Sequence, residues 1–198
     1  MKKTIIAALV GGIIIFIWQF LSWSLINLHQ PTQQHTPKQE AIMNFLNSQQ
    51  LEEGGYFMPG LPDNASTDEM EQLMKESEGK PWASIQYHKA MNTNMVMNMI
   101  RGLLVNIIAV FLLCWILVRM AAPSFGTILT ASLFTGFIVF LNAPYTNFIW
   151  YDGFDIWAHL ADAVISWGAC GLWLAWWLRR NSLHISDRKM KDETPVIR

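Results

Sequence analysis

Residues 4–28 read TIIAALVGGIIIFIWQFLSWSLINL, a run of 25 residues without one charged side chain. A hydrocarbon core about 30 Å thick is crossed by about 20 residues of α-helix, so this run predicts a membrane-spanning helix. Lys2 and Lys3 precede it, as basic residues precede the core of a signal peptide. That core is only about 7–15 residues long and ends at a small-residue cleavage site. The longer run favours an uncleaved signal-anchor helix over a cleaved signal peptide.

Three further apolar runs extend this pattern along the chain. They cover residues 102–118, 124–141 and 157–178. Only five residues separate the second run from the third, which favours a helical hairpin. The predicted fold class is therefore all-α integral membrane, with a bundle of four transmembrane helices in residues 1–28 and 102–178.

The composition supports a membrane protein over a soluble enzyme. Of the 198 residues, 52% are hydrophobic and only 15% are charged, whereas roughly 25% are charged in an average soluble domain. The net charge of −1, with no basic domain, argues against nucleic-acid binding. Cys114 and Cys170 both lie inside apolar runs, which argues against a disulfide framework or a Cys-x-x-Cys metal site.

Lysine and arginine residues predict the orientation, because cytoplasmic flanks carry an excess of them. With the N-terminus inside, the cytoplasmic flanks hold Lys2, Lys3, Arg119, Arg179, Arg180, Arg188, Lys189, Lys191 and Arg198. Residues 29–100 hold four lysines against nine acidic residues. We therefore expect both termini in the cytoplasm, a basic cytoplasmic tail at residues 179–198, and an extracytoplasmic segment at residues 29–101.

The segment at residues 29–101 is predicted to be a small, mainly helical domain. Residues 36–39, Thr-Pro-Lys-Gln, have the form of a capping box that begins one helix. A second capping box at Ser66–Glu69 begins another, which ends near Gly79 and Pro81. Between them, residues 56–62 are expected to form an apolar loop.

Polar residues in the fourth run predict a pocket. Asp155, His159, Asp162 and Ser166 lie on one face of a helix at 100° per residue. Asp162 and Asn106 both lie about 8 Å inside the extracytoplasmic boundary at 1.5 Å per residue. Gln19 occupies the same layer, and Arg101, Asn106 or His159 is a natural partner for Asp162.

Two interpretations of this polar stripe remain open. An ionisable group in hydrocarbon costs several kcal/mol, which favours a ligand or proton site. Polar side chains between membrane helices also serve as packing contacts of about 0.6 kcal/mol each. His159 and Asp162 are consistent with either interpretation.

A second candidate site depends on the second helix extending outward. In that case His88, Met91, Met95 and Met99 would share one helix face. Thioether and imidazole ligands together suit Cu(I). Methionine is also a flexible packing residue, which is the alternative explanation.

Several motifs together resemble a family of small bacterial inner-membrane proteins with no known activity. They are residues 17–23 (IWQFLSW), 87–91 (YHKAM), 98–102 (NMIRG) and 159–162 (HLAD). The resemblance implies a location in the bacterial inner membrane and no particular activity.

Three classes of function follow from these patterns. The first is a non-enzymatic accessory or interaction protein of the cell envelope, which contacts the lipid bilayer and binds an envelope protein or a second copy of itself. The second is a small transporter or a metal- or proton-handling protein that uses the His159/Asp162 pocket. The third is an enzyme with one of these two residues as a base. No nucleophile or oxyanion arrangement is visible, so no catalytic residue is assigned and no cofactor is predicted.

Overall fold

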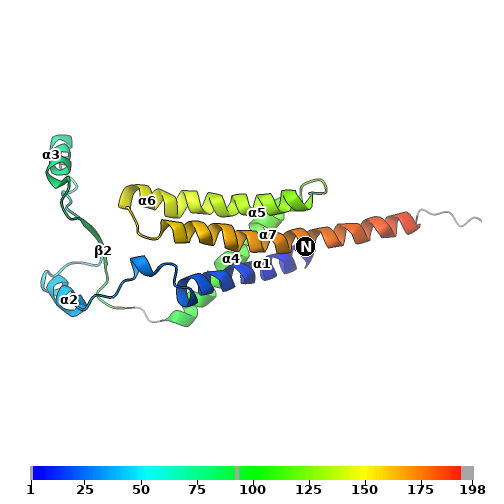
Figure 1. Ribbon diagram of the computed structural model, residues 1–198, viewed down its shortest axis with the longest axis horizontal. Coiled ribbons are helices and arrows are strands. Elements are labelled where there is room, and N and C mark those ends of the chain that lie inside the picture. The colour runs from blue at the N-terminus through cyan, green and yellow to red at the C-terminus, as the bar shows by residue number, and fades with distance from the viewer. Residues whose placement is uncertain (1, 92–93, 193–198) are drawn as a thin grey trace, which may run out of the picture. The chain divides into compact units, whose positions relative to one another are not determined.

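The computed structural model describes residues 2–91 and 94–192, with side chains described up to residue 180 (Figure 1). The described chain is mostly helical. It divides into two compact units, one formed by Met1–Gln34 with Asn94–Arg198 and the other by His35–Thr93. The first unit contains the long apolar helices, and the second contains the acidic segment of the sequence.

The long helices of the first unit pack in a defined order. They are α1 (Lys2–Phe20), α4 (Met95–Leu117), α5 (Phe125–Phe140) and α7 (Ile156–Asp192). Helix α1 contacts both α4 and α7, and α7 contacts both α1 and α5. A π-helical turn, η1 (Leu21–Leu25), extends α1. Helix α5 continues through a second π-helical turn, η3 (Leu141–Tyr145), into α6 (Thr146–Tyr151).

Three helical segments among the described residues are long and apolar enough to cross a membrane. They are Lys2–Leu25, Met95–Leu117 and Phe125–Tyr151, and they indicate a membrane protein. Many of their large apolar side chains are exposed, which is consistent with contact with lipid. Helix α7 is long but less hydrophobic, because it carries five tryptophans together with His159 and Asp162. A fourth membrane-spanning helix therefore stays a prediction.

Two helix boundaries differ from the prediction. The structure begins α4 at Met95, because the Asn94 side chain accepts a hydrogen bond from the Met97 amide at 3.1 Å and caps the helix. The third apolar run was predicted to end at residue 141, but the chain stays helical beyond it. The π-helical turn η3 accommodates Pro144, and the helix ends only where Asp152 adopts a positive φ of 34°.

Small residues allow the helices to approach closely in the core. The buried cluster includes Ala7 and Ala8 of α1, Val110 and Cys114 of α4, and Cys170 of α7. A Cβ atom at Gly12 would lie 2.7 Å from the Cα atom of Ile107, so the backbones of α1 and α4 nearly touch there. Such contacts are typical of membrane helices, since packing replaces the hydrophobic effect between them.

The second unit contains two helices and a small sheet. Helix α2 spans Gln39–Ser48 and α3 spans Thr67–Ser77, while β1 (Gly54–Met58) pairs antiparallel with β2 (Ala83–Tyr87). The predicted apolar loop at residues 56–62 was wrong in part, because its first three residues belong to β1. Tyr56 and Phe57 favour a strand, but the partner strand is distant in sequence, so the local pattern does not reveal the pairing.

The two predicted capping boxes have different outcomes. The box at Ser66 is confirmed, since Ser66 Oγ accepts from the Glu69 amide and Glu69 accepts from the Ser66 amide at 2.7 Å. The prediction of a capping box at Thr36 is wrong. Helix α2 begins at Gln39 without a side-chain cap, and Thr36 Oγ1 instead accepts from the Lys38 amide at 3.3 Å.

The contact between α1 and α4 can be tested with two glycine substitutions. We expect Gly12→Ala to lower the free energy of unfolding by about 1–3 kcal/mol, because the added Cβ meets backbone atoms of Ile107. Gly102→Ala is the matched control, since its Cβ would lie 3.7 Å from Phe16, an ordinary contact. Denaturant titration in micelles measures both variants. Equal stability of the two would contradict the close approach.

The capping box of α3 predicts a pH dependence. The hydrogen bond from the Ser66 amide, followed by that from its hydroxyl, lowers the pKa of Glu69 below the ordinary glutamate value. A lowered pKa means that the ionised form stabilises α3 above the ordinary glutamate pKa. This contribution is lost as the pH falls through the lower pKa of the folded state. An NMR titration of the Glu69 carboxyl carbon should show the low midpoint, and Ser66→Ala should raise it.

Candidate functional site

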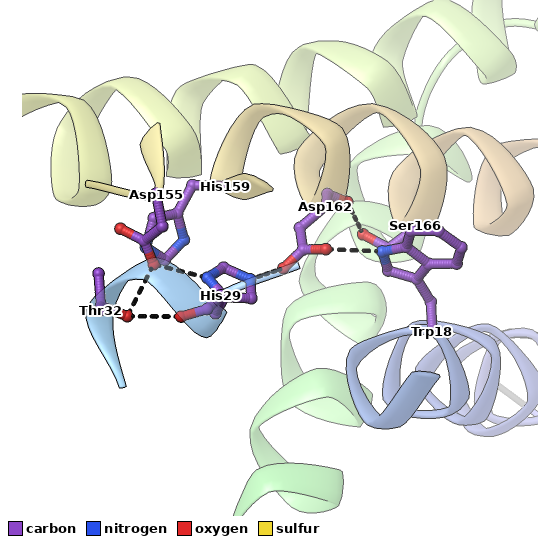
Figure 2. Close-up of polar contacts among 7 residues, drawn as sticks. All are labelled: Trp18, His29, Thr32, Asp155, His159, Asp162 and Ser166. Carbon is purple, nitrogen blue, oxygen red and sulfur yellow. Dashed lines mark hydrogen bonds and ion pairs between the residues drawn. The ribbon is translucent and has the colours of Figure 1, made fainter. Parts of the chain in front are cut away.

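Four ionisable side chains meet at the end of the helical unit where α7 begins (Figure 2). Asp155 directly precedes α7, and His159 and Asp162 lie on its first two turns. His29 comes from the segment between η1 and the short 3₁₀ helix η2 (Gln30–Thr32). His29 and Asp155 are 126 positions apart in the sequence, so the cluster depends on tertiary structure.

His29 lies between two carboxylates. Its Nδ1 is 2.6 Å from Asp155 Oδ2, and its Nε2 is 3.0 Å from Asp162 Oδ2. The imidazole is almost completely buried, with a side-chain exposure of 1%. Each contact needs one proton, so the three groups together hold two. They form either an imidazolium between two carboxylates or a neutral imidazole with one protonated carboxyl group.

Asp162 is oriented by contacts to both of its oxygens. Trp18 Nε1 on α1 donates to Oδ1 at 2.8 Å, while Oδ2 faces His29. One turn farther along α7, the Ser166 hydroxyl donates to the Asp162 main-chain carbonyl at 2.6 Å. The carboxylate plane is therefore defined by groups from α1 and from the segment that follows it.

Asp155 connects the two histidines of the cluster. Besides its contact with His29, Asp155 Oδ2 is 3.4 Å from His159 Nε2. The Thr32 hydroxyl lies 2.9 Å from the His29 carbonyl oxygen and 3.5 Å from Asp155 Oδ2. Thr32 thus fixes the backbone that carries His29 on the side facing α7.

Trp23 fixes the plane of the His29 ring. The two rings are stacked, with centroids 3.8 Å apart and an interplanar angle of 7°. His159 meets the His29 ring edge-on, with centroids 4.7 Å apart. The imidazole of His29 is therefore held by one stacked ring and one edge contact in addition to its two polar contacts.

The chain reversal after α1 brings His29 back to α7. In the π-helical turn η1 the Ile26 amide donates to the Leu21 carbonyl, and the Leu28 amide then donates to the Ser22 carbonyl. Asn27 adopts a positive φ of 57°, which asparagine tolerates better than most residues. This turn places His29 beside the helix end instead of extending the chain away from it.

The structure brings together part of the predicted pocket. Asp155, His159, Asp162 and Ser166 gather there, as shown in Figure 2. Gln19 and Asn106 instead bind each other at 2.7 Å, between α1 and α4. Arg101 is exposed on α4. The hydrogen-bond partners of the Asp162 side chain are thus His29 and Trp18, and not the predicted Arg101, Asn106 or His159.

His29, Trp18 and Trp23 were missed by the sequence analysis. His29 directly follows the first apolar run, so it was assigned from the sequence to the extracytoplasmic segment at residues 29–101. Trp18 and Trp23 stand inside the first apolar run, where the sequence predicts only a membrane-spanning helix. The one available signal was a histidine directly after an apolar run and before a proline-containing turn, at Leu28-His29-Gln30-Pro31.

The polar cluster does not continue along α7 toward its other half. There Trp173 Nε1 donates to the Ala7 carbonyl at 3.3 Å, and Trp177 Nε1 donates to the Lys3 carbonyl at 3.2 Å. The two rings are stacked, with centroids 5.3 Å apart. Bulky aromatic side chains thus occupy the space between α1 and α7 beyond the cluster.

The predicted methionine and histidine face is not formed on one helix. Helix α4 begins at Met95, so Met95 and Met99 lie on it, whereas His88 and Met91 precede it and belong to the other compact unit. Met91 and Met95 are both highly exposed. This part of the chain does not provide the shared helix face on which the copper-site interpretation depended.

Removing His29 tests whether it balances the two carboxylates. We expect His29→Ala to lower the free energy of unfolding by about 3 kcal/mol, because Asp155 and Asp162 would both lose the imidazole that lies between them. In the double variant, Asp155→Asn should restore part of the lost free energy of unfolding, because it removes one of the two negative charges. The control is His88→Ala, an exposed histidine of the other unit. Unchanged stability of His29→Ala in a denaturant titration would contradict the arrangement.

Comparison with known protein families, curated proteins and solved structures gives no match for this chain. Any function assigned to it therefore depends on the residues themselves. Among the described residues, His29, His159 and Asp162 offer ligand atoms that all lie within 4.8 Å of one another.

Proposed function

We propose that the chain is a multi-pass membrane protein that binds a divalent transition-metal ion through His29, His159 and Asp162. The observation that carries this proposal is the convergence of two imidazoles and one carboxylate, with ligand atoms within 4.8 Å of one another. Imidazole nitrogen and carboxylate oxygen are the usual ligands of zinc and of related first-row ions. Three protein ligands would leave a further coordination position for water or another small ligand.

One pair of these ligand atoms has the spacing that a single ion requires. Zinc lies about 2.0–2.2 Å from imidazole nitrogen and carboxylate oxygen, which places two adjacent ligands about 3–3.5 Å apart. His29 Nε2 and Asp162 Oδ2 are 3.0 Å apart. His159 is the most exposed of the four side chains of the cluster, at 30%, so a rotation of its ring completes the set.

The remaining contacts match those that orient ligands in metal sites. A ligating histidine usually donates its other ring N–H to a carboxylate, which fixes its tautomer. Asp155 Oδ2 stands 2.6 Å from His29 Nδ1 and supplies this partner when Nε2 binds the ion. Trp18 holds the second oxygen of Asp162. The structure contains both of these supporting contacts.

The charges favour an ion site over a helix-packing contact. An imidazolium at His29 would balance the charge of only one of the two carboxylates that contact it. Here two carboxylates converge on one buried imidazole, and the second histidine contacts Asp155 only at 3.4 Å. A divalent cation would balance the surplus of negative charge among these side chains.

We place the protein in the bacterial inner membrane, with an uncleaved signal-anchor helix, four spans and both termini in the cytoplasm. The three membrane-capable segments support the membrane location. The basic residues at the predicted cytoplasmic flanks, and the nine acidic residues in 29–100, support the orientation. In this arrangement α7 is the fourth span and the metal site faces the extracytoplasmic side.

A second candidate function is that of a non-enzymatic accessory protein of the envelope. The unit His35–Thr93 supports it, because its surface combines acidic residues with exposed apolar side chains such as Phe45 and Trp82. A transporter is less well supported. Trp173 and Trp177 fill the space between α1 and α7, so a single copy offers no continuous polar path there.

Metal binding can be measured on full-length protein in nanodiscs, without a polyhistidine tag and after treatment with a chelator. We expect Co²⁺ to bind with one-to-one stoichiometry, to give d–d absorption bands, and to be displaced by Zn²⁺. Asp155→Asn should weaken binding about 10–100-fold as a supporting residue. Asp162→Asn and His159→Ala should weaken it more, because they remove ligands.

Asp152→Asn is the matched control, since it makes the same change at an exposed acidic residue three positions before Asp155. Its affinity for Co²⁺ should equal that of the unmodified chain, and circular dichroism should show that all variants fold. Absence of saturable Co²⁺ binding, or equal loss in Asp152→Asn and Asp162→Asn, would contradict the proposed function.

A further inference from the structure

Strand β2 in the unit His35–Thr93 has an edge that no other strand of the described residues covers. The sheet has two strands, so β1 is the one strand that pairs with β2 among them. Every second residue of β2 therefore directs its N–H and C=O away from β1. None of the backbone hydrogen bonds that join separate described segments reaches Ala83–Tyr87.

The sequence of β2 leaves this edge unprotected. Proteins usually guard exposed edges with charged side chains or proline within the strand. Residues 83–87 read Ala-Ser-Ile-Gln-Tyr and contain neither. The charged residues of this unit lie outside its two strands. An uncharged edge strand in an otherwise charged domain is a surface suited to pairing with another strand.

Two hollows border β2, one at each end. The first, of about 560 Å³, is lined by residues of β1 and α3 and by the segment that leads into β2; they include the apolar Met58, Leu73 and Trp82 and the charged Glu76 and Lys80. The second, of about 360 Å³, is lined by Met43 and Leu46 of α2 together with Ile85 and Tyr87. At about 3.3 Å per residue, a strand alongside β2 would place alternate side chains at both hollows.

The charge of the unit indicates what kind of segment would bind. The unit holds nine acidic residues and four lysines. Lys89 is paired with Glu52 at 2.6 Å, and Lys75 lies 4.0 Å from Glu71, so ion pairs within the unit occupy half of these lysines. The surplus of carboxylates would attract a positively charged segment and repel an acidic one.

We infer that β2 is the docking edge for an extended, positively charged segment of another envelope protein, with apolar side chains at alternate positions. The segment would add a third strand beside β2, and its apolar side chains would enter the two hollows. Backbone hydrogen bonds would supply affinity, and the hollows would supply selectivity. This surface lies within one compact unit and does not depend on the metal site.

A second copy of the chain fits this edge less well. Its own unit carries the same surplus of acidic residues, so two such units repel each other. Strand β1 is a weaker docking edge, because Met58 is its only residue that lines either hollow. Both comparisons favour a basic partner at β2.

The test uses full-length protein in nanodiscs and fluorescein-labelled nonapeptides. The probe alternates lysine and valine, and binding is measured by fluorescence anisotropy. One comparison peptide alternates glutamate and valine. Another keeps the lysine–valine sequence but carries alternate N-methyl groups on the backbone, which remove strand pairing without changing the charge. We expect saturable binding of the probe and at least about tenfold weaker binding of both comparison peptides.

Matched substitutions test the hollows. Trp82→Ala should weaken binding of the lysine–valine peptide at least about tenfold, because Trp82 lines the larger hollow. Phe45→Ala removes an aromatic side chain that is more exposed, at 63%, and lines neither hollow, so it should bind as the unmodified chain does. Circular dichroism checks that both variants fold.

Three results would overturn the inference. Equal binding of the N-methylated peptide would show attraction by charge alone. Equal affinity of Trp82→Ala and the unmodified chain for the lysine–valine peptide would show that the larger hollow is not part of the binding site. Self-association of the chain that is lost in Trp82→Ala, without saturable peptide binding, would assign the edge to a second copy.

Discussion

The position of His29 between Asp155 and Asp162 is the constraint on which the helical unit depends. Two carboxylates beside apolar helices are costly unless their charge is balanced. One buried imidazole contacts both of them and at the same time closes the chain reversal that follows α1. The end of α1, the turn after it and the start of α7 are thus held by one set of contacts.

The rest of the helical unit follows from this arrangement. Trp18 binds Asp162 near the start of α7, whereas Trp173 and Trp177 bind carbonyl oxygens near the start of α1. These contacts fix α1 and α7 antiparallel along their length. The ionisable cluster lies at one end of this helix pair, and Trp173 and Trp177 fill the space at the other end.

The sequence predicts the long apolar helices of the helical unit, but it does not predict which side chains contact one another between them. Long uncharged runs identify membrane-capable helices, because hydrocarbon thickness sets their length. The helical period also placed Asp155, His159 and Asp162 on one face. The role of His29 was missed because its position depends on a π-helical turn and on a positive φ at Asn27. No local sequence pattern predicts either feature. The pairing of β1 with β2 was missed because strands distant in sequence leave no periodic signal.

The order of the chain has a consequence for biogenesis. Trp18 and His29 are synthesised with the first helix, but their partners on α7 come last, with 126 positions between His29 and Asp155. Until α7 is synthesised and packs against α1, His29 lacks its contacts with Asp155 and Asp162. Completion of the cluster therefore coincides with completion of the bundle, and a chain truncated before α7 would expose unpaired polar groups that quality-control proteases can recognise.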